Sequence, residues 1–165
     1  MAKQSVRKKA PTQSAKKKTQ PQKLRPTTKA QTRRKATTVV ASIPPLRGAT
    51  ESRVLGGVCL DIGKAGSARV KRMIYPPGFR WSTNMKPVVG TDLCMHAHVG
   101  YLAQGEIHIE YWDGCVVELK APQILSIEPG HDGWVVGRTP VIMIEFDFER
   151  DTLGKLGMPN SHSHP

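Results

Sequence analysis

The sequence predicts a small all-β sandwich or barrel in its second two-thirds. From Val54 onward, short apolar stretches are broken by glycine and proline, and none combines the length, helical period and caps of a helix. Strands that recur at such close spacing are typical of all-β domains rather than of a parallel α/β sheet. The expected strands span residues 69–75, 91–98, 99–104, 106–112, 115–119, 122–127, 133–136 and 140–148.

Turn residues support these breaks. Asp113-Gly114 suits the two central positions of a tight hairpin turn, where both residues need a positive φ. The run 128–131, Glu-Pro-Gly-His, suits a type II turn, because proline fixes φ and glycine takes the left-handed conformation.

The last expected strand alternates strictly between two kinds of side chain. Ile142, Ile144, Phe146 and Phe148 share one face, and Glu145 and Asp147 lie on the other. We expect the apolar face, including both phenylalanines, to face the core.

The N-terminal part has a different composition. Residues 1–35 contain thirteen of the 25 lysines and arginines and no acidic residue, so the excess charge of the chain belongs to them. Residues 1–48 are expected to form a disordered basic extension, because they hold too few large apolar side chains to offset the entropy of ordering. Three basic clusters predict salt-sensitive, sequence-independent binding of nucleic acid or another polyanion; a solubilising extension is the alternative. The clusters are Arg7-Lys8-Lys9, Lys16-Lys17-Lys18 and Arg33-Arg34-Lys35.

The cysteines and the hydropathy pattern indicate the compartment. Cys59, Cys94 and Cys115 are odd in number and form no CxxC pair, which argues against a disulfide framework and for a reducing compartment. No apolar run reaches the length of about 18 residues that a membrane span needs, and no hydrophobic segment follows the basic N-terminus. The sequence therefore predicts a cytoplasmic protein with no membrane partner.

One expected strand concentrates groups that bind metals. If residues 91–98 are extended, Asp92, Cys94, His96 and His98 project from one face. Imidazole, thiolate and carboxylate suit Fe, Mn, Zn or Ni, and His131, after the Pro-Gly turn, could add a further ligand. The alternative is a polar pocket without a metal.

The remaining histidines have simpler interpretations. His108 alternates with Glu106 and Glu110, opposite Ile107 and Ile109, which predicts an exposed polar ladder. His162 and His164 lie in the polar segment 151–165, which is expected to be a frayed tail. Trp81 and Trp112 are expected to be packing or rim residues, and Cys59 and Cys115 small buried side chains.

Two motifs resemble those of the cupin family. Tyr101-Leu102-Ala103-Gln104-Gly105 is similar to the YVLxG strand and turn of cupins, and residues 127–137, IEPGHDGWVVG, are similar to the second cupin motif. The resemblance covers about residues 68–148 and implies a double-stranded β-helix, the jelly-roll barrel, within residues 49–150. It also implies an internal pocket, with His98, Tyr101, His131 and Trp134 as its expected lining.

The metal ligands implied by the resemblance are incomplete. The first cupin motif reads Gly-x5-His-x-His-x3,4-Glu-x6-Gly. In one register Gly90 is followed by His96 and His98, but Leu102 or Ala103 then stands at the glutamate position. In the other register, anchored on Tyr101 and Gly105, His98 takes the glutamate position, and Asp92 and Cys94 take those of the histidines. Both registers keep His98 as a ligand.

Three functions remain open at this point. The first is a cupin that binds a small molecule, with or without one divalent metal ion. The second is a metal-dependent cupin enzyme, such as a dioxygenase, isomerase or decarboxylase, acting on a small polar substrate. The third is a nucleic-acid-associated protein that acts through the basic extension. A homodimer is expected to use edge strands, for which residues 54–62 are the candidate.

Overall fold

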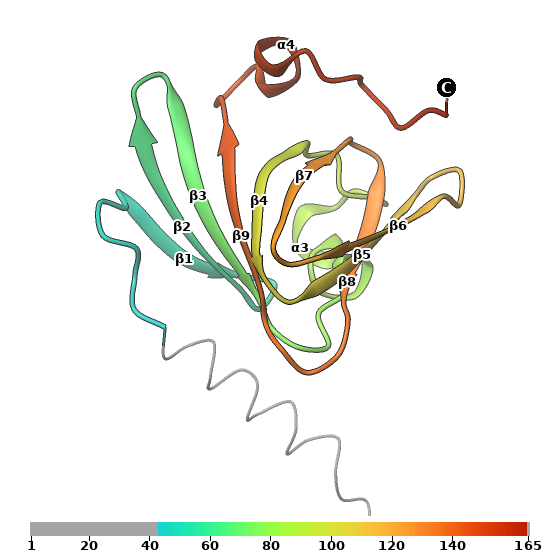
Figure 1. The fold of residues 1–165 in the computed structure, drawn as a ribbon, viewed down its shortest axis with the longest axis horizontal. Helices are drawn as coiled ribbons and strands as arrows, with labels where there is room; N and C mark the ends of the chain where they lie inside the picture. The colour runs from blue at the N-terminus through green and yellow to red at the C-terminus, as the bar shows by residue number, and fades with distance from the viewer. Residues whose placement is uncertain (1–42, 165) are drawn as a thin grey trace, which may run out of the picture.

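The computed structural model describes residues 43–164, and the three basic clusters lie outside these residues. The described chain folds into two antiparallel sheets that face each other (Figure 1). The larger has the order β1-β2-β3-β9-β4-β7 and the smaller the order β6-β5-β8. The strands are β1 (Glu51–Leu55), β2 (Val58–Ala65), β3 (Ala68–Tyr75), β4 (His98–Gln104), β5 (Glu106–Tyr111), β6 (Val116–Lys120), β7 (Gln123–Ile127), β8 (His131–Val135) and β9 (Val141–Asp147).

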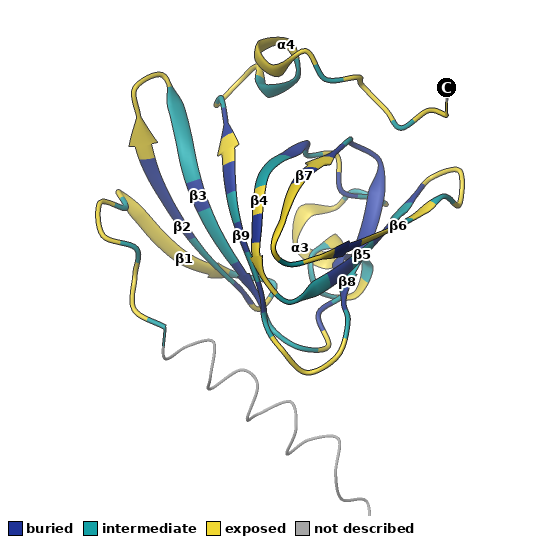
Figure 2. Cartoon of the chain, in the orientation of Figure 1, coloured by how far each residue is buried: buried dark blue, intermediate teal, exposed yellow. Residues whose placement is uncertain are grey.

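The predicted all-β jelly-roll barrel is confirmed. β9, the last strand, lies between β3 and β4, which are consecutive strands much earlier in the sequence. The core between the sheets is apolar, as the alternation of the strands requires. Its fully buried members include Ile74, Leu102, Leu125, Ile127, Val141 and Met143, whereas β1, an edge strand, is mostly exposed (Figure 2).

The alternation of β9 is confirmed, but its assignment to faces is wrong. Glu145 and Asp147 point into the barrel and are 1% exposed, whereas Phe146 lies on the outer surface and is 46% exposed. The reason is the register with β3, which places Lys71 opposite Glu145 and Arg69 opposite Asp147. Oppositely charged partners on the neighbouring strand allow both carboxylates to be buried, and the period of two then turns Phe146 outward.

Residues 91–97 do not form the predicted strand. Only Cys94 makes an isolated bridge, to His131, and the strand begins at His98. Upstream, two short helices that the sequence did not predict, α2 (Trp81–Asn84) and α3 (Lys86–Val89), lead into this segment. Four residues are too few to show a helical period. Instead, Asp132 of β8 accepts hydrogen bonds from the backbone N–H and the hydroxyl of Ser82 and so fixes the start of α2.

The two predicted turns differ in outcome. Gly130 has φ 91°, as the predicted type II turn requires. In the β5–β6 hairpin only Gly114 has a positive φ, and Asp113 does not. Gly114 N–H bonds to the carbonyl of Tyr111, and Tyr111 N–H bonds to Cys115, which is a type I turn followed by a glycine bulge.

The sequence predicted a frayed C-terminal segment, but this segment is ordered and packs on the barrel. Helix α4 (Thr152–Leu156) begins at Asp151, whose side chain accepts a hydrogen bond from Gly154 N–H. The chain then crosses the end of the barrel to the β5–β6 hairpin, where the ring of His162 stacks on Tyr111 (Figure 1). No helix within residues 43–164 has the length and apolarity that a membrane crossing demands.

The close approach of β4 and β9 depends on Gly100. A Cβ atom there would overlap the carbonyl oxygen of Ile144 and crowd the Cα atom of Glu145. We predict that Gly100→Ala lowers the free energy of unfolding by about 3 kcal/mol, since the two backbones would have to separate. Ile124→Ala on β7, where the side chain is 82% exposed, should change it by less than about 0.5 kcal/mol. Urea denaturation measures both, and equal effects would contradict the assignment.

Candidate functional site

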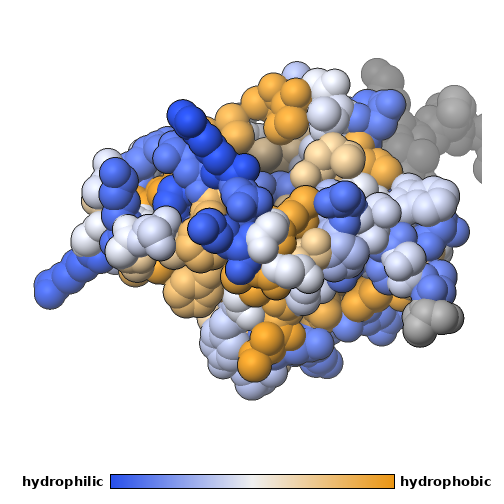
Figure 3. Space-filling view, turned by 90° about the horizontal axis from the view of Figure 1, so that it is seen from above, coloured by the Kyte–Doolittle hydropathy of each residue, from blue (hydrophilic) through white to orange (hydrophobic). Residues whose placement is uncertain are grey.

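A cavity of about 470 Å³ lies inside the barrel between the two sheets. Most of its wall is apolar and comes from both sheets and from α2, with Leu60, Met73, Trp81, Ile109 and Met143 as examples. Cysteine and histidine side chains gather on one part of the wall. Seen from the end at which α4 lies, hydrophobic residues are interspersed with hydrophilic ones (Figure 3). The cavity is a mainly apolar chamber, with Lys71 and His96 on one polar part of its wall and a corner of cysteine and histidine on another.

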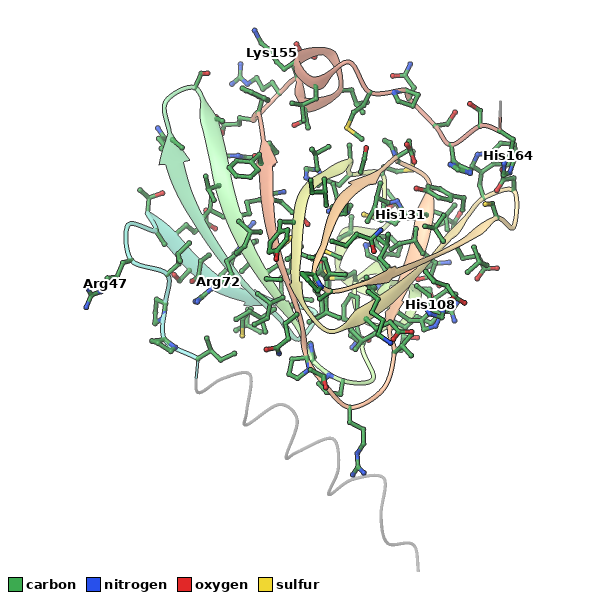
Figure 4. The ribbon with its side chains drawn as sticks, viewed as in Figure 1. Arg47, Arg72, His108, His131, Lys155 and His164 are labelled. Atoms are coloured by element: carbon green, nitrogen blue, oxygen red, sulfur yellow. The ribbon has the colours of Figure 1, made fainter. Side chains whose placement is uncertain are left out.

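That corner is formed by Cys94, His98 and His131, all three of them buried. One ligand atom from each lies within 4.8 Å of the others, and Cys94 Sγ is 3.6 Å from His98 Nε2. The rings of His98 and His131 meet edge to face, with their centres 5.2 Å apart. Figure 4 shows His131 within the barrel, whereas His108 lies on its outer side.

Backbone pairing brings these three residues together. His98 opens β4 opposite Ile127, the last residue of β7. The Pro-Gly turn after β7 leads directly to His131, at the start of β8. Cys94 is joined to this turn by three backbone hydrogen bonds, which it exchanges with Gly130 and His131. The site is thus built from two strand ends and one tethered loop.

Each of the two histidines is oriented by a hydrogen-bond partner on Nδ1, the ring nitrogen that points away from the corner. Nδ1 of His98 lies 2.8 Å from Glu145 Oε1, and Nδ1 of His131 lies 2.6 Å from the carbonyl oxygen of Glu128. In the neutral state both Nδ1 atoms donate to these oxygens, which leaves each Nε2 with a lone pair. Metal-binding histidines in proteins are held in this way by carboxylates and carbonyls.

The electrostatics of the corner favour a thiolate. Burial alone would raise the pKa of Cys94, but hydrogen bonds with His131 and His98 outweigh it and lower this pKa to about 5. Burial alone would also lower the pKa of His98, but the charge of Glu145 and the contact with Cys94 raise it to about 10. Without a bound metal ion, the pair is therefore a thiolate beside an imidazolium.

His96 belongs to a different part of the wall. Its Nε2 accepts a hydrogen bond of 2.7 Å from the ammonium group of Lys71, which also lies 3.2 Å from Glu145 and 3.0 Å from Asp147. Burial, followed by the charges of His98 and Lys71, lowers the pKa of His96 to about 4, so its ring is neutral. The buried lysine thus engages one of the two ring nitrogens of His96. His96, His98 and Glu145 also bring one ligand atom each within 4.8 Å of one another, but Nδ1 of His98 and the carboxylate of Glu145 are already bonded to each other there.

The structure places three further predicted residues outside the site. Asp92 is not on a strand; its side chain is 93% exposed and pairs with Lys86. Tyr101 stands opposite Ile144 and Ile124 on the outer face of the large sheet.

Trp134 also points away from the cavity, because side chains alternate along β8 and its neighbour Gly133 is on the cavity side. Of the expected pocket lining, only His98 and His131 remain. Trp134 faces His108 across the outer side of the small sheet, and the Arg80 guanidinium lies 4.5 Å from the centre of its ring. His108 itself lies 3.3 Å from Glu106. The alternation of β5 is as predicted, but the polar side chains of this ladder are half-buried and not exposed.

Sequence reasoning missed Glu145 and Lys71. Both lie in ordinary alternating strands, and their partners are distant in sequence. A carboxylate in β9 and a lysine in β3 at inward positions could have been found only by assigning the register correctly. Neither cupin register provides a glutamate near His98, and Glu145 places one there. Its carboxylate contacts Nδ1 of His98, so it orients that ring and is not one of the three ligands in the corner.

Comparisons with known proteins agree with the fold. The structure is similar to a Cupin 2 conserved barrel domain protein from Salinispora arenicola, with 11% identity, 70% of this chain and 95% of that one covered, and a TM-score of 0.47. It is also similar to an RmlC-like cupin from Shewanella frigidimarina, with 20% identity, 64% and 90% coverage, and a TM-score of 0.43. The predicted likeness to cupins is confirmed. It concerns the fold alone.

A third similar structure is an enzyme, the hydroxypropylphosphonic acid epoxidase from S. wedmorenis in complex with fosfomycin. It shares 8% identity, with 64% of this chain and 59% of that one covered, and a TM-score of 0.39. No protein-family model and no curated protein matches the sequence.

The ion pair between Glu145 and His98 predicts a specific pH dependence of stability. The His98 charge and the Lys71 ammonium outweigh burial and lower the pKa of Glu145 to about 2, so its contribution is complete above pH 4.5 and declines below it. The contribution of His98 is complete below pH 6.5 and is lost as pH rises through about 10. The pair should therefore stabilise the metal-free protein most between pH 4.5 and pH 6.5.

Urea denaturation of metal-free protein between about pH 3 and pH 9 measures this effect. In Glu145→Gln the acidic flank should flatten because the titrating carboxyl group is gone, and the alkaline flank should flatten in part because His98 loses the charge of Glu145 and keeps only the contact with Cys94. Glu149→Gln, at an exposed position of the segment that follows β9, should keep the wild-type profile. Parallel profiles for all three proteins would contradict the proposed ion pair.

Proposed function

We propose that this barrel binds a small organic molecule in its cavity beside one divalent metal ion held by Cys94, His98 and His131. The observation that carries the proposal is the orientation of the two histidines, each with Nδ1 on an oxygen acceptor and Nε2 toward the corner that contains Cys94 Sγ. A polar pocket without a metal would not need both rings to be fixed in this way.

The donor set fits a borderline metal ion such as Zn²⁺. One thiolate and two imidazoles match its preference for sulfur and nitrogen, and three protein ligands leave a coordination position for an exogenous group. Once bound, such an ion would supply Lewis acidity to a polar group of the ligand. Asp92 and His96 lie outside this set.

The cavity wall indicates the class of small molecule. An apolar chamber of about 470 Å³ fits a compact organic molecule with a substantial hydrocarbon part. The charged side chains among the described lining residues, apart from histidine, are Arg53, Arg69 and Lys71. Each of these cations is already paired with a carboxylate: Arg53 with Glu51, Arg69 with Asp147, and Lys71 with Glu145 and Asp147. The wall itself therefore selects for the hydrocarbon part of the ligand, and a polar group of the ligand would be bound by the metal ion.

A second candidate function is nucleophilic catalysis by Cys94. The Cys94 thiol, the His98 ring and the Glu145 carboxylate are linked one after the other in space. Cys94 Sγ lies 3.6 Å from His98 Nε2, and His98 Nδ1 lies 2.8 Å from the carboxylate of Glu145. This is the nucleophile, base and orienting acid of a catalytic triad. A metal-dependent cupin enzyme remains the other enzymatic candidate, and it needs the same three ligands as the binding protein.

Metal titration of the chelator-treated full chain tests the main proposal. We predict that Cys94→Ser, His98→Ala and His131→Ala each weaken binding to the barrel site by more than about 100-fold, since removing a ligand should exceed the loss from removing an outer partner. Affinity should also fall toward acidic pH, because Cys94 and His98 bind the ion only in their deprotonated forms and release their protons to solvent on binding. His108→Ala is the matched control, and its affinity should equal that of the wild type.

Alkylation by iodoacetamide separates the two candidates. If Cys94 binds a metal ion, saturating Zn²⁺ should slow its alkylation at least tenfold, because the metal holds the thiolate that would react. A binding curve unchanged in the three ligand variants, together with equal alkylation rates with and without Zn²⁺, would leave the nucleophile as the better account.

A separate proposal concerns residues 1–48, and it rests on their charge alone. Thirteen basic and no acidic side chains in residues 1–35 favour binding to a polyanion. We predict that deleting residues 1–48 abolishes retention on heparin and on DNA at about 0.1 M salt, whereas circular dichroism shows an intact barrel. Equal retention of the truncated protein would show that the barrel itself binds.

A further inference from the structure

A second cluster of metal-binding side chains lies on the outside of the barrel, where the C-terminal segment meets the β5–β6 hairpin. Cys115 belongs to the hairpin, and His162 and His164 belong to the segment that follows α4. One ligand atom from each lies within 4.8 Å of the others. Figure 4 shows His164 at this end of the molecule, and His131 inside the barrel.

The position of His162 is defined by contacts with Tyr111 and Glu128, which also bind each other. Its ring stacks on Tyr111, with 3.8 Å between ring centres and 7° between planes. Its Nδ1 lies 3.6 Å from the carboxylate of Glu128, which also accepts a hydrogen bond of 2.7 Å from the Tyr111 hydroxyl. These contacts fix the ring in one orientation.

The other nitrogen of this ring, Nε2, is buried and has no hydrogen-bond partner among the described residues. An imidazole nitrogen that is desolvated without a partner costs free energy. A metal ion would remove this cost, because Nε2 is the atom left available once Glu128 has engaged Nδ1. The carboxylate-histidine pair again has the form found around metal ions in proteins.

We propose that Cys115, His162 and His164 bind a Zn²⁺-class transition metal ion at this place. Thiolate and imidazole ligands at 2.0–2.3 Å from a tetrahedral ion lie roughly 3.3–3.8 Å from one another. The ligand atoms lie within 4.8 Å of one another, so the cluster needs to contract by no more than about 1.5 Å, which two histidines on a short terminal segment can supply. Asp113, whose carboxylate is 3.4 Å from His164 Nε2, can orient that ring or add an oxygen ligand.

Metal binding here would join the C-terminal segment to the hairpin. Because the ligands come from both, the ion stabilises the docked segment by mass action. Residues 158–164 should then become more protected from proteolysis and hydrogen exchange when the ion is present.

The test separates this site from the one inside the barrel. Chelator-treated full-length Cys94→Ser/His131→Ala protein is titrated with Co²⁺, whose thiolate coordination gives a near-ultraviolet charge-transfer band. We expect one ion per chain and a band that disappears in the further variant Cys115→Ser. Replacing His162 or His164 by alanine should weaken binding by more than about 100-fold, Glu128→Gln by about 10- to 100-fold, and His108→Ala should have no effect.

If the double variant does not fold, the same substitutions are made in the wild type, where each should remove one of the bound ions and leave the other. Absence of the thiolate band in the double variant, or a band that survives Cys115→Ser, would overturn this site without bearing on the barrel site. Loss of the barrel site alone would leave this proposal standing.

Discussion

The buried carboxylates of β9 are the constraint on which most of the interior depends. Glu145 and Asp147 stand on the inward face of a central strand, where an unpaired charge would cost several kcal/mol. Each is matched by a basic residue at the facing position of β3, Lys71 and Arg69 respectively. Removing one partner leaves a charge buried without compensation, so the pairing fixes the register of β3 against β9. That register in turn decides which side chains line the cavity.

The same carboxylates divide the polar wall into two parts. Glu145 holds the outer nitrogen of His98 and so leaves its Nε2 toward Cys94. Lys71, which pairs with Glu145 and Asp147, donates a hydrogen bond to Nε2 of His96. Two histidines that are neighbours in the sequence thus have opposite roles. One is oriented toward a metal or a thiolate, and the other satisfies a buried ammonium group.

The parts of this structure that local patterning controls could be predicted, and those that depend on long-range pairing could not. Turn residues and alternation gave the strands from residue 68 onward and the positive φ of Gly130. The grouping of Cys94, His98 and His131 followed from residue chemistry, although residues 91–97 are not a strand. The orientation of β9 was misjudged because apolar residues were assumed to face inward, and its actual orientation is set by charges on β3. Tyr101 and Trp134 were placed in the pocket by motif, whereas the register of their strands turns both outward.

Glu128 connects the two clusters of cysteine and histidine through different atoms. Its backbone carbonyl accepts from His131 inside the barrel, and its carboxylate contacts Tyr111 and His162 outside. The ring of Tyr111 lies 6.0 Å from that of His131 and is stacked on His162. The Pro-Gly turn after Glu128 fixes its carbonyl, so a change at the outer cluster can reach the inner one only through small shifts of this turn and of Tyr111. Glu128→Gln changes the carboxylate and keeps the backbone carbonyl, so its effect is expected at the outer cluster and not at His131.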